Sequence, residues 1–225
     1  LSLQGLAVVA DAVIPLGTAS ADGEGVGGLV VLPSQDAIVA TTIGGLGSIL
    51  RVSPTGVVSR VHTGPPIGSL AVDPAGDLLF VATAWGIEAL PVTGGPTLPV
   101  HAGGGIANLE FLPPAALTFT RGNAVHLLDL ATGVVTQIHS TPFLTAATVE
   151  RTTGALLVAT ATLFPAPGSV GWTMVGGTLQ SLGLVDLVTD LEVVDNPRVY
   201  GTPTAAAHAY AWSTMPNPGG LPRIG

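Results

Sequence analysis

Three histidines recur at an even spacing along the chain. His62, His101 and His139 are separated by 39 and 38 residues, and they stand in the similar segments "RVHTG", "PVHAG" and "QIHST". Imidazole is a common zinc ligand, and zinc holds its nitrogen ligands at about 2.1 Å, so three histidines could form a metal site if the fold gathered them. The even spacing therefore turns attention to the elements that position them.

The histidines belong to a longer internal repeat. Five apolar segments, each following a Gly- or Pro-rich loop, begin at Val26, Ile67, Ile106, Leu144 and Val188, in steps of 41, 39, 38 and 44 residues. Each continues through a turn into a second apolar run, such as "LLFVATA", and then into further short strand-like segments. Four strands in about forty residues is the period of a β-propeller blade.

The apolar runs also fit blades that stack against one another. A strand buried on both faces is expected to be almost continuously apolar, whereas a half-exposed strand alternates. We therefore predict an all-β protein, a single β-propeller domain over residues 1–225, built of four-stranded antiparallel blades. Five blades are expected, and six are possible if the N-terminal segment forms half a blade. The expected units are about 26–66, 67–105, 106–143, 144–187 and 188–225, with residues 1–25 as closing strands.

Two stretches carry a family resemblance. The segments "SLAVDPAGDLLFVATAWGIEALPVTGG" and "NAVHLLDLATGVVTQI" resemble the repeats of YVTN and NHL-like propellers, within the gluconolactonase-like superfamily. The resemblance covers residues 26–185 well and the fifth unit poorly. No Trp-Asp dipeptide occurs, which disfavours a WD-repeat protein. Such a resemblance implies a fold more strongly than an activity.

Composition excludes some classes of partner. The net charge is −8, and the six basic residues are all arginines, so no basic patch for nucleic acid is expected. There are no cysteines to form disulfides or thiolate sites. The apolar N-terminal segment is interrupted by Asp11 and Pro15, so it predicts neither a complete signal peptide nor membrane insertion. The lysine-free, Ala/Gly/Thr/Val-rich composition is typical of exported bacterial proteins, and we expect a secreted or extracytoplasmic location.

A ligand is expected where the blades converge. The loops that lead into the first strand of every blade lie on one face, around the mouth of the central channel, and we call this the channel-mouth face. The third position of each first strand forms a row across the blades, the channel-mouth row: Gly28, Ser69, Asn108, Ala146 and Asp190. Ser69, Asn108 and Asp190 are the candidate ligand-binding residues.

The same row resembles a reduced form of the gluconolactonase-type metal site. That resemblance implies one divalent cation, Ca²⁺ or Mg²⁺, with Asn108 and Asp190 as oxygen ligands and the remaining places filled by water or by loop residues such as Asp22, Glu24 and Asp186. Gly28 and Ala146 offer no side-chain ligand. The alternative is that Asn108 and Asp190 cap turns by hydrogen bonding to loop amides, in which case no cofactor is needed.

The histidines stand seven residues before this row, at the ends of the fourth strands. Strand alternation places His139 on the same side as Gln137, and His62 on the same side as Arg60, facing solvent or the next blade. Neighbouring blades are spaced by about 10 Å or more at this radius, too far for three imidazoles to share an ion. We expect His62, His101 and His139 to be structural.

A few other residues invite interpretation. Trp85, Trp172 and Trp212 are expected to pack between blades rather than form a sugar-stacking platform, and His126 is expected to be buried. The glycine-rich "GGGIAN" leads into a strand, so no helix N-terminus is available there for a phosphate.

Three functions remain open at this point. The first is a non-catalytic propeller that binds a protein or small molecule at the channel-mouth face. The second is a metal-dependent hydrolase or lactonase that uses Asn108, Asp190 and nearby acids. The third is a surface or structural protein that assembles through its blade edges.

Overall fold

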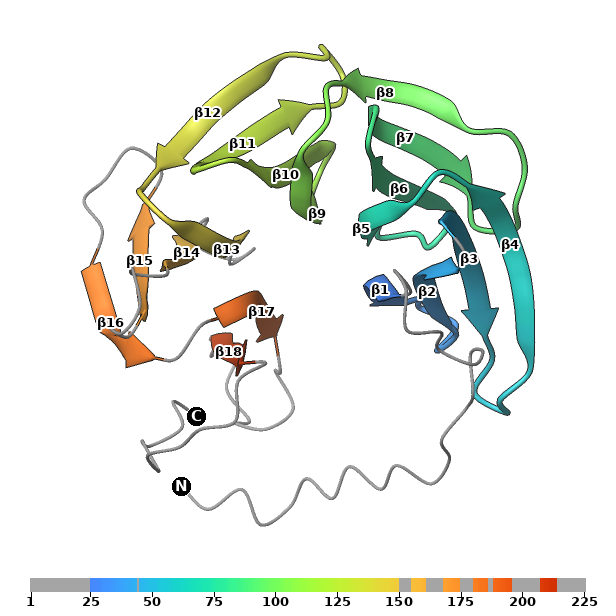
Figure 1. Ribbon diagram of the computed structural model, residues 1–225, viewed down its shortest axis with the longest axis horizontal. Coiled ribbons are helices and arrows are strands. Elements are labelled where there is room, and N and C mark those ends of the chain that lie inside the picture. The colour runs from blue at the N-terminus through green and yellow to red at the C-terminus, as the bar shows by residue number, and fades with distance from the viewer. Residues whose placement is uncertain are drawn as a thin grey trace.

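A computed structural model describes residues 25–43, 45–149, 155–160, 168–174, 180–185, 188–195 and 207–213. They form five antiparallel sheets, each built from strands that are consecutive in the chain (Figure 1). Among these residues there is no helix long and apolar enough to cross a membrane.

The first four sheets have four strands each. The first contains β1 (Gly25–Val31), β2 (Ala37–Ile43), β3 (Leu46–Val52) and β4 (Val58–Gly64). The second contains β5 (Ile67–Val72), β6 (Leu78–Thr83), β7 (Gly86–Pro91) and β8 (Leu98–Ala102). The third contains β9 (Ile106–Leu112), β10 (Ala116–Arg121), β11 (Ala124–Asp129) and β12 (Val135–Ser140). The fourth contains β13 (Leu144–Val149), β14 (Ala155–Thr160), β15 (Gly168–Met174) and β16 (Gln180–Val185).

The fifth sheet, within the described residues, pairs β17 (Val188–Asp195) with β18 (Ala207–Ser213). Figure 1 shows the five sheets arranged around a common centre, with β1, β5, β9, β13 and β17 innermost and β4, β8, β12 and β16 at the rim. The predicted fold class, four-stranded antiparallel propeller blades, is confirmed. The closing strands predicted for residues 1–25 lie almost entirely outside the described residues, and the single closed domain stays a prediction.

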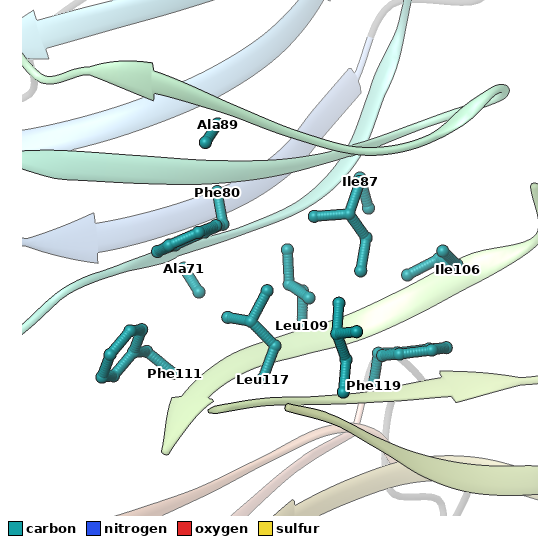
Figure 2. Close-up of a cluster of buried hydrophobic side chains, with 11 residues drawn as sticks. Ala71, Phe80, Ile87, Ala89, Ile106, Leu109, Phe111, Leu117 and Phe119 are labelled. Atoms are coloured by element: carbon teal, nitrogen blue, oxygen red, sulfur yellow. The ribbon is translucent and has the colours of Figure 1, made fainter. Parts of the chain in front are cut away.

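The sheets are held together by apolar side chains in the seams between them. The second strand of each of the first four sheets is mostly buried on both faces, as in β6, where five of the six residues are buried. Figure 2 shows the seam between the second and third sheets, where residues such as Phe80, Ile87, Phe111, Leu117 and Phe119 interdigitate. The rings of Phe80 and Phe111 lie 5.8 Å apart, and further clusters fill the seams on either side. This explains why the strands are continuously apolar.

A β-bulge recurs near the start of every innermost strand. The pairing register breaks between Val26 and Gly28, between Ile67 and Ser69, between Leu144 and Ala146, and between Val188 and Asp190, and β9 has its extra residue between Ala107 and Glu110. A bulge re-aims the side chains that follow it and increases the local twist. In each blade the bulge lies at or directly before the residue of the channel-mouth row. It therefore determines the direction in which the side chain of that residue points.

The bulge also brings neighbouring blades close together. A Cβ added at Gly27 would lie 1.8 Å from the carbonyl oxygen of Ile67. No side chain fits in that space, so glycine is required at this bulge for the first and second sheets to meet.

Candidate functional site at the channel mouth

The innermost strands of the first four sheets wall a channel of about 1070 Å³. Three members of the channel-mouth row, Gly28, Ser69 and Asn108, line it. Ala146 is fully buried instead. Asp190 occupies the corresponding register position in β17, opposite Trp212, and its side chain lies outside the described part of the chain. The structure thus brings Ser69 and Asn108 together on the channel wall.

Both side chains make hydrogen bonds between blades. The Leu109 N–H donates to Ser69 Oγ at 2.9 Å, which links β5 to β9. Asn108 Nδ2 donates to Thr120 Oγ1 at 3.0 Å and to the carbonyl oxygen of Thr145 at 3.4 Å, which links β9 to β13. Asn108 has a φ of 48°, a left-handed conformation that asparagine tolerates better than most residues. Its amide oxygen has no hydrogen-bond partner among the described residues.

Glu110 is a channel-wall residue that the sequence reasoning missed. Its Oε2 accepts hydrogen bonds from Thr148 Oγ1 at 2.9 Å and from the Val149 N–H at 3.1 Å, again from β9 to β13. A carboxylate inside an otherwise apolar strand was the available signal, and Glu192 repeats it two residues after Asp190.

The ligands predicted for a divalent cation are only partly present on this wall. The amide nitrogen of Asn108 and one oxygen of Glu110 are engaged between blades, and no group of three or more His, Asp or Glu side chains suited to a metal occurs among the described residues. The described wall therefore does not by itself make a cation site. The remaining predicted ligands, Asp190, Asp22, Glu24 and Asp186, have side chains outside the described part.

Strand alternation predicted that His62 shares a side with Arg60 and His139 with Gln137, and the pairing register of these strands is different. His139 pairs with Val125 and Gln137 pairs with the adjacent His126, so Ile138 is an extra, bulged residue. The same break precedes His62 and His101. Because each bulge shifts the alternation by one residue, His62 and His139 lie opposite to Arg60 and Gln137 rather than beside them, and this part of the prediction was wrong.

The ring nitrogens of His101 and His139 are turned away from solvent. The Nε2 atoms of His101 and His139 are buried, and neither has a hydrogen-bond partner among the described residues. The His101 ring lies 5.9 Å from Phe119 of the next blade, and Phe119 stacks on His126 at 5.3 Å. His126 is buried, as expected. Desolvation first, and then the nearby charge of Arg121, lower the pKa of both His101 and His126.

The prediction that Trp85 packs between blades was also wrong. It is 74% exposed in the two-residue turn between β6 and β7. A hairpin turn extends beyond the layer where neighbouring sheets touch, so its side chain finds no apolar partner. The turn is nevertheless fixed: the Trp85 N–H donates to Thr83 Oγ1 at 3.2 Å, and its carbonyl accepts from the Gly103 N–H at 2.9 Å.

Phe143 is a second exposed aromatic at the same end of the blades. It immediately precedes β13, is 49% exposed and has a φ of 58°. A bulky residue in the left-handed region is strained, and such strain often occurs at binding sites. Trp85 lies on the same face, because the end of β6 is paired with the start of β5 through Thr83 and Ile67. The channel-mouth face therefore presents two exposed aromatic side chains.

These features define a β-propeller with exposed aromatic side chains and a polar row at one mouth of its channel. No protein-family model matches the chain, and no curated protein matches its sequence. Solved structures do match its fold. A chain of the nidogen/laminin complex aligns with a TM-score of 0.62 at 13% identity, over 74% of this chain and 67% of that one.

Two further structures give the same result. Hydrazine synthase from Kuenenia stuttgartiensis aligns with a TM-score of 0.62 at 14% identity, over 91% of this chain and 67% of that one. A structural genomics protein of unknown function from Bacteroides thetaiotaomicron aligns with a TM-score of 0.52 at 13% identity. That alignment covers 69% of this chain but only 42% of the Bacteroides protein. At such identities the likeness shows the fold alone.

Proposed function

We propose that this protein is a non-catalytic propeller of the YVTN/NHL-like type that binds a protein or small-molecule ligand at its channel-mouth face, outside the bacterial cytoplasm. One observation carries the proposal: Trp85 exposes 74% of its surface on a turn fixed by hydrogen bonds. A rigid, exposed aromatic side chain supplies contact area at little entropic cost, which is why tryptophan is enriched in binding hot spots.

The arrangement of the channel wall supports binding more than chemistry. Ser69, Asn108 and Glu110 use polar atoms to join neighbouring blades, so these groups are held in place for packing. The nidogen/laminin complex, similar in fold, gives one example of a propeller relative found in a protein assembly.

A fragment screen compares the two faces of the molecule. Small aromatic and polar fragments are tested by ligand-observed NMR against the wild type, Trp85→Ala and Val134→Ala. Val134 is the matched control, because it is 57% exposed in the β11–β12 turn, at the opposite end of the blades. We expect fragments whose binding is lost in Trp85→Ala and kept in Val134→Ala. Fragments that bind Trp85→Ala as well as the wild type, or a screen in which no fragment binds, would contradict the proposal.

A metal-dependent hydrolase or lactonase is the second candidate. It is favoured by Asp190, which holds the row position of Asn108 in the fifth sheet, with Glu192 repeating Glu110. If it is correct, the purified protein will contain about one Ca²⁺ or Mg²⁺ per chain, and a chelator will lower its melting temperature and abolish lactone hydrolysis. A protein without stoichiometric metal, and indifferent to the chelator, would eliminate this candidate.

A further inference from the structure

A small site lies on the channel-mouth face where the second and third sheets meet. Three elements form it: the turn that carries Trp85, the loop Gly103–Gly105, and Arg121 at the end of β10. We propose that it binds an acidic peptide segment, with Arg121 pairing a carboxylate and Trp85 packing against a neighbouring apolar residue. This inference deepens the proposed function, because it gives a chemical class to the partner.

The three elements are contiguous through Gly103. The Gly103 N–H donates to the Trp85 carbonyl at 2.9 Å, and a Cβ added at Gly103 would come within 3.2 Å of Arg121 Nη1. The guanidinium therefore lies against the face of this glycine. With a φ of 117°, Gly103 also adopts a conformation that other residues rarely take. Glycine at this position lets the arginine lie beside the tryptophan turn.

The loop adds hydrogen-bond donors. Gly104 fits closely against the tryptophan turn, since an added Cβ would lie 2.4 Å from the Ala84 carbonyl oxygen. Within the described residues, the N–H groups of Gly104 and Gly105 have no hydrogen-bond partner, and Gly105 is exposed. Exposed backbone amides bind carboxylate and peptide carbonyl oxygens. The loop can thus bind the same segment that Arg121 and Trp85 contact.

The charges around the site favour an anionic partner. Arg121 is exposed, and the one ion pair found in the described part of the chain joins Arg51 to Asp36 instead. In the first four sheets, the described aspartates lie in or beside turns at the opposite end of the blades: Asp36, Asp73, Asp77 and Asp129. An unpaired guanidinium in a protein of net charge −8 is therefore left free to bind a carboxylate of a partner.

An acidic peptide fits better than a sulfated polysaccharide. A polysulfated chain is held by several basic residues acting together, whereas this site offers one guanidinium beside the turn that carries an exposed tryptophan. A glutamate or aspartate next to an apolar residue, carried on an extended backbone, satisfies the guanidinium, the indole and the loop amides at once.

Titration calorimetry with defined probes tests the inference. The probe is acetyl-Phe-Glu-Phe-Glu-amide, compared with acetyl-Phe-Lys-Phe-Lys-amide and with a heparin tetrasaccharide. We expect the glutamate peptide to bind with a Kd on the order of 1 mM or tighter, more weakly at higher salt, and the lysine peptide not to bind. Equal binding of the two peptides, or tighter binding of the heparin fragment, would overturn the proposal.

Variants locate the binding. Arg121→Gln and Trp85→Ala should each weaken the glutamate peptide about tenfold, and Arg121→Lys should restore only part of the affinity, because lysine lacks the planar fork. Arg60→Gln is the control, since Arg60 is an exposed arginine on the rim strand β4. Thermal unfolding verifies that each variant is folded. An unchanged affinity in Arg121→Gln would refute the site.

The outcome separates this inference from the proposed function. If Trp85-dependent fragments bind but the glutamate peptide does not, the binding face stands and the peptide class is wrong. If the glutamate peptide does not bind and no fragment depends on Trp85 either, the assignment of ligand binding to the channel-mouth face fails together with the peptide class.

Discussion

The rings of His101 and His126 both lie against Phe119 at the seam between the second and third sheets, and we expect the stability of this seam to depend on pH. Burial and the charge of Arg121 lower the pKa of both histidines in the folded protein. The folded state therefore favours their neutral forms, whereas the unfolded chain takes up protons below pH ~6.5. Because the unfolded state then binds more protons, the free energy of unfolding rises with pH in this range and falls as the solution becomes acidic.

We expect a loss of stability between pH 7.5 and 5.5, above the range in which most carboxyl groups titrate. Urea unfolding of the wild type and of His126→Phe at the two pH values measures it. The variant should lose less stability than the wild type on acidification, because one of the two titrating groups has been removed. Equal losses would show that His126 is not responsible.

Single residues also show where sequence reasoning reaches its limit. The position of Asn108 at the channel follows from the repeat alone, because register fixes which residues face the centre. The exposure of Trp85 could not be predicted from the repeat. A tryptophan next to the apolar start of β7 is expected to pack in a seam, and Trp85 is outside the seam only because it lies in the two-residue turn. The place of Glu110 on the wall does not follow from the channel-mouth row, because the channel is lined by β9 from Ala107 to Phe111 and not at one position only.

At the scale of elements, Glu110 joins two innermost strands. Its carboxylate accepts from a side chain and from a backbone N–H of β13. Glu110→Ala leaves the Val149 N–H without this partner, so we expect it to destabilise the protein by about 1–3 kcal/mol. Glu110→Gln, which keeps an acceptor oxygen, should cost less. Chemical denaturation gives both values, and a Glu110→Ala variant as stable as wild type would refute this role.

The structure of the rim strands determines whether two copies of the chain can pair edge to edge. In β4, β8 and β12 a bulge interrupts the pairing with the preceding strand, and β8 also contains Pro99. Bulges and prolines on edge strands disfavour pairing with another chain. We therefore expect a monodisperse monomer in multi-angle light scattering at high protein concentration. Concentration-dependent growth would instead favour a structural protein that assembles through its edges.

These bulges could not be predicted from the sequence pattern, and they determine on which face of the sheet the later side chains lie. Strand positions follow from apolar runs and turn residues, and the four-stranded units begin close to the predicted residues. A bulge adds one residue without changing composition, so an argument from strict alternation places every later side chain on the wrong face. The error in the orientation of the histidines had this cause.

For the whole molecule, closure of the ring is the open prediction. The described part of the fifth sheet has two strands where its neighbours have four, and residues 1–25 were predicted to supply closing strands. If so, deleting residues 1–24 should lower the melting temperature by on the order of 5 °C or more, measured by calorimetry. A truncated protein that melts like the full chain would argue against such closure.

The hydrogen bonds between innermost strands differ between the two seams that flank the third sheet. Between the second and third sheets a serine oxygen accepts from a backbone amide, whereas between the third and fourth an asparagine donates and a glutamate accepts. A blade inserted out of order, or borrowed from another copy of the chain, would set these groups against the wrong partners and leave them unsatisfied. These polar residues therefore make the pairing of neighbouring blades specific. We expect this specificity to favour the native order of the blades and to disfavour exchange of blades between copies of the chain.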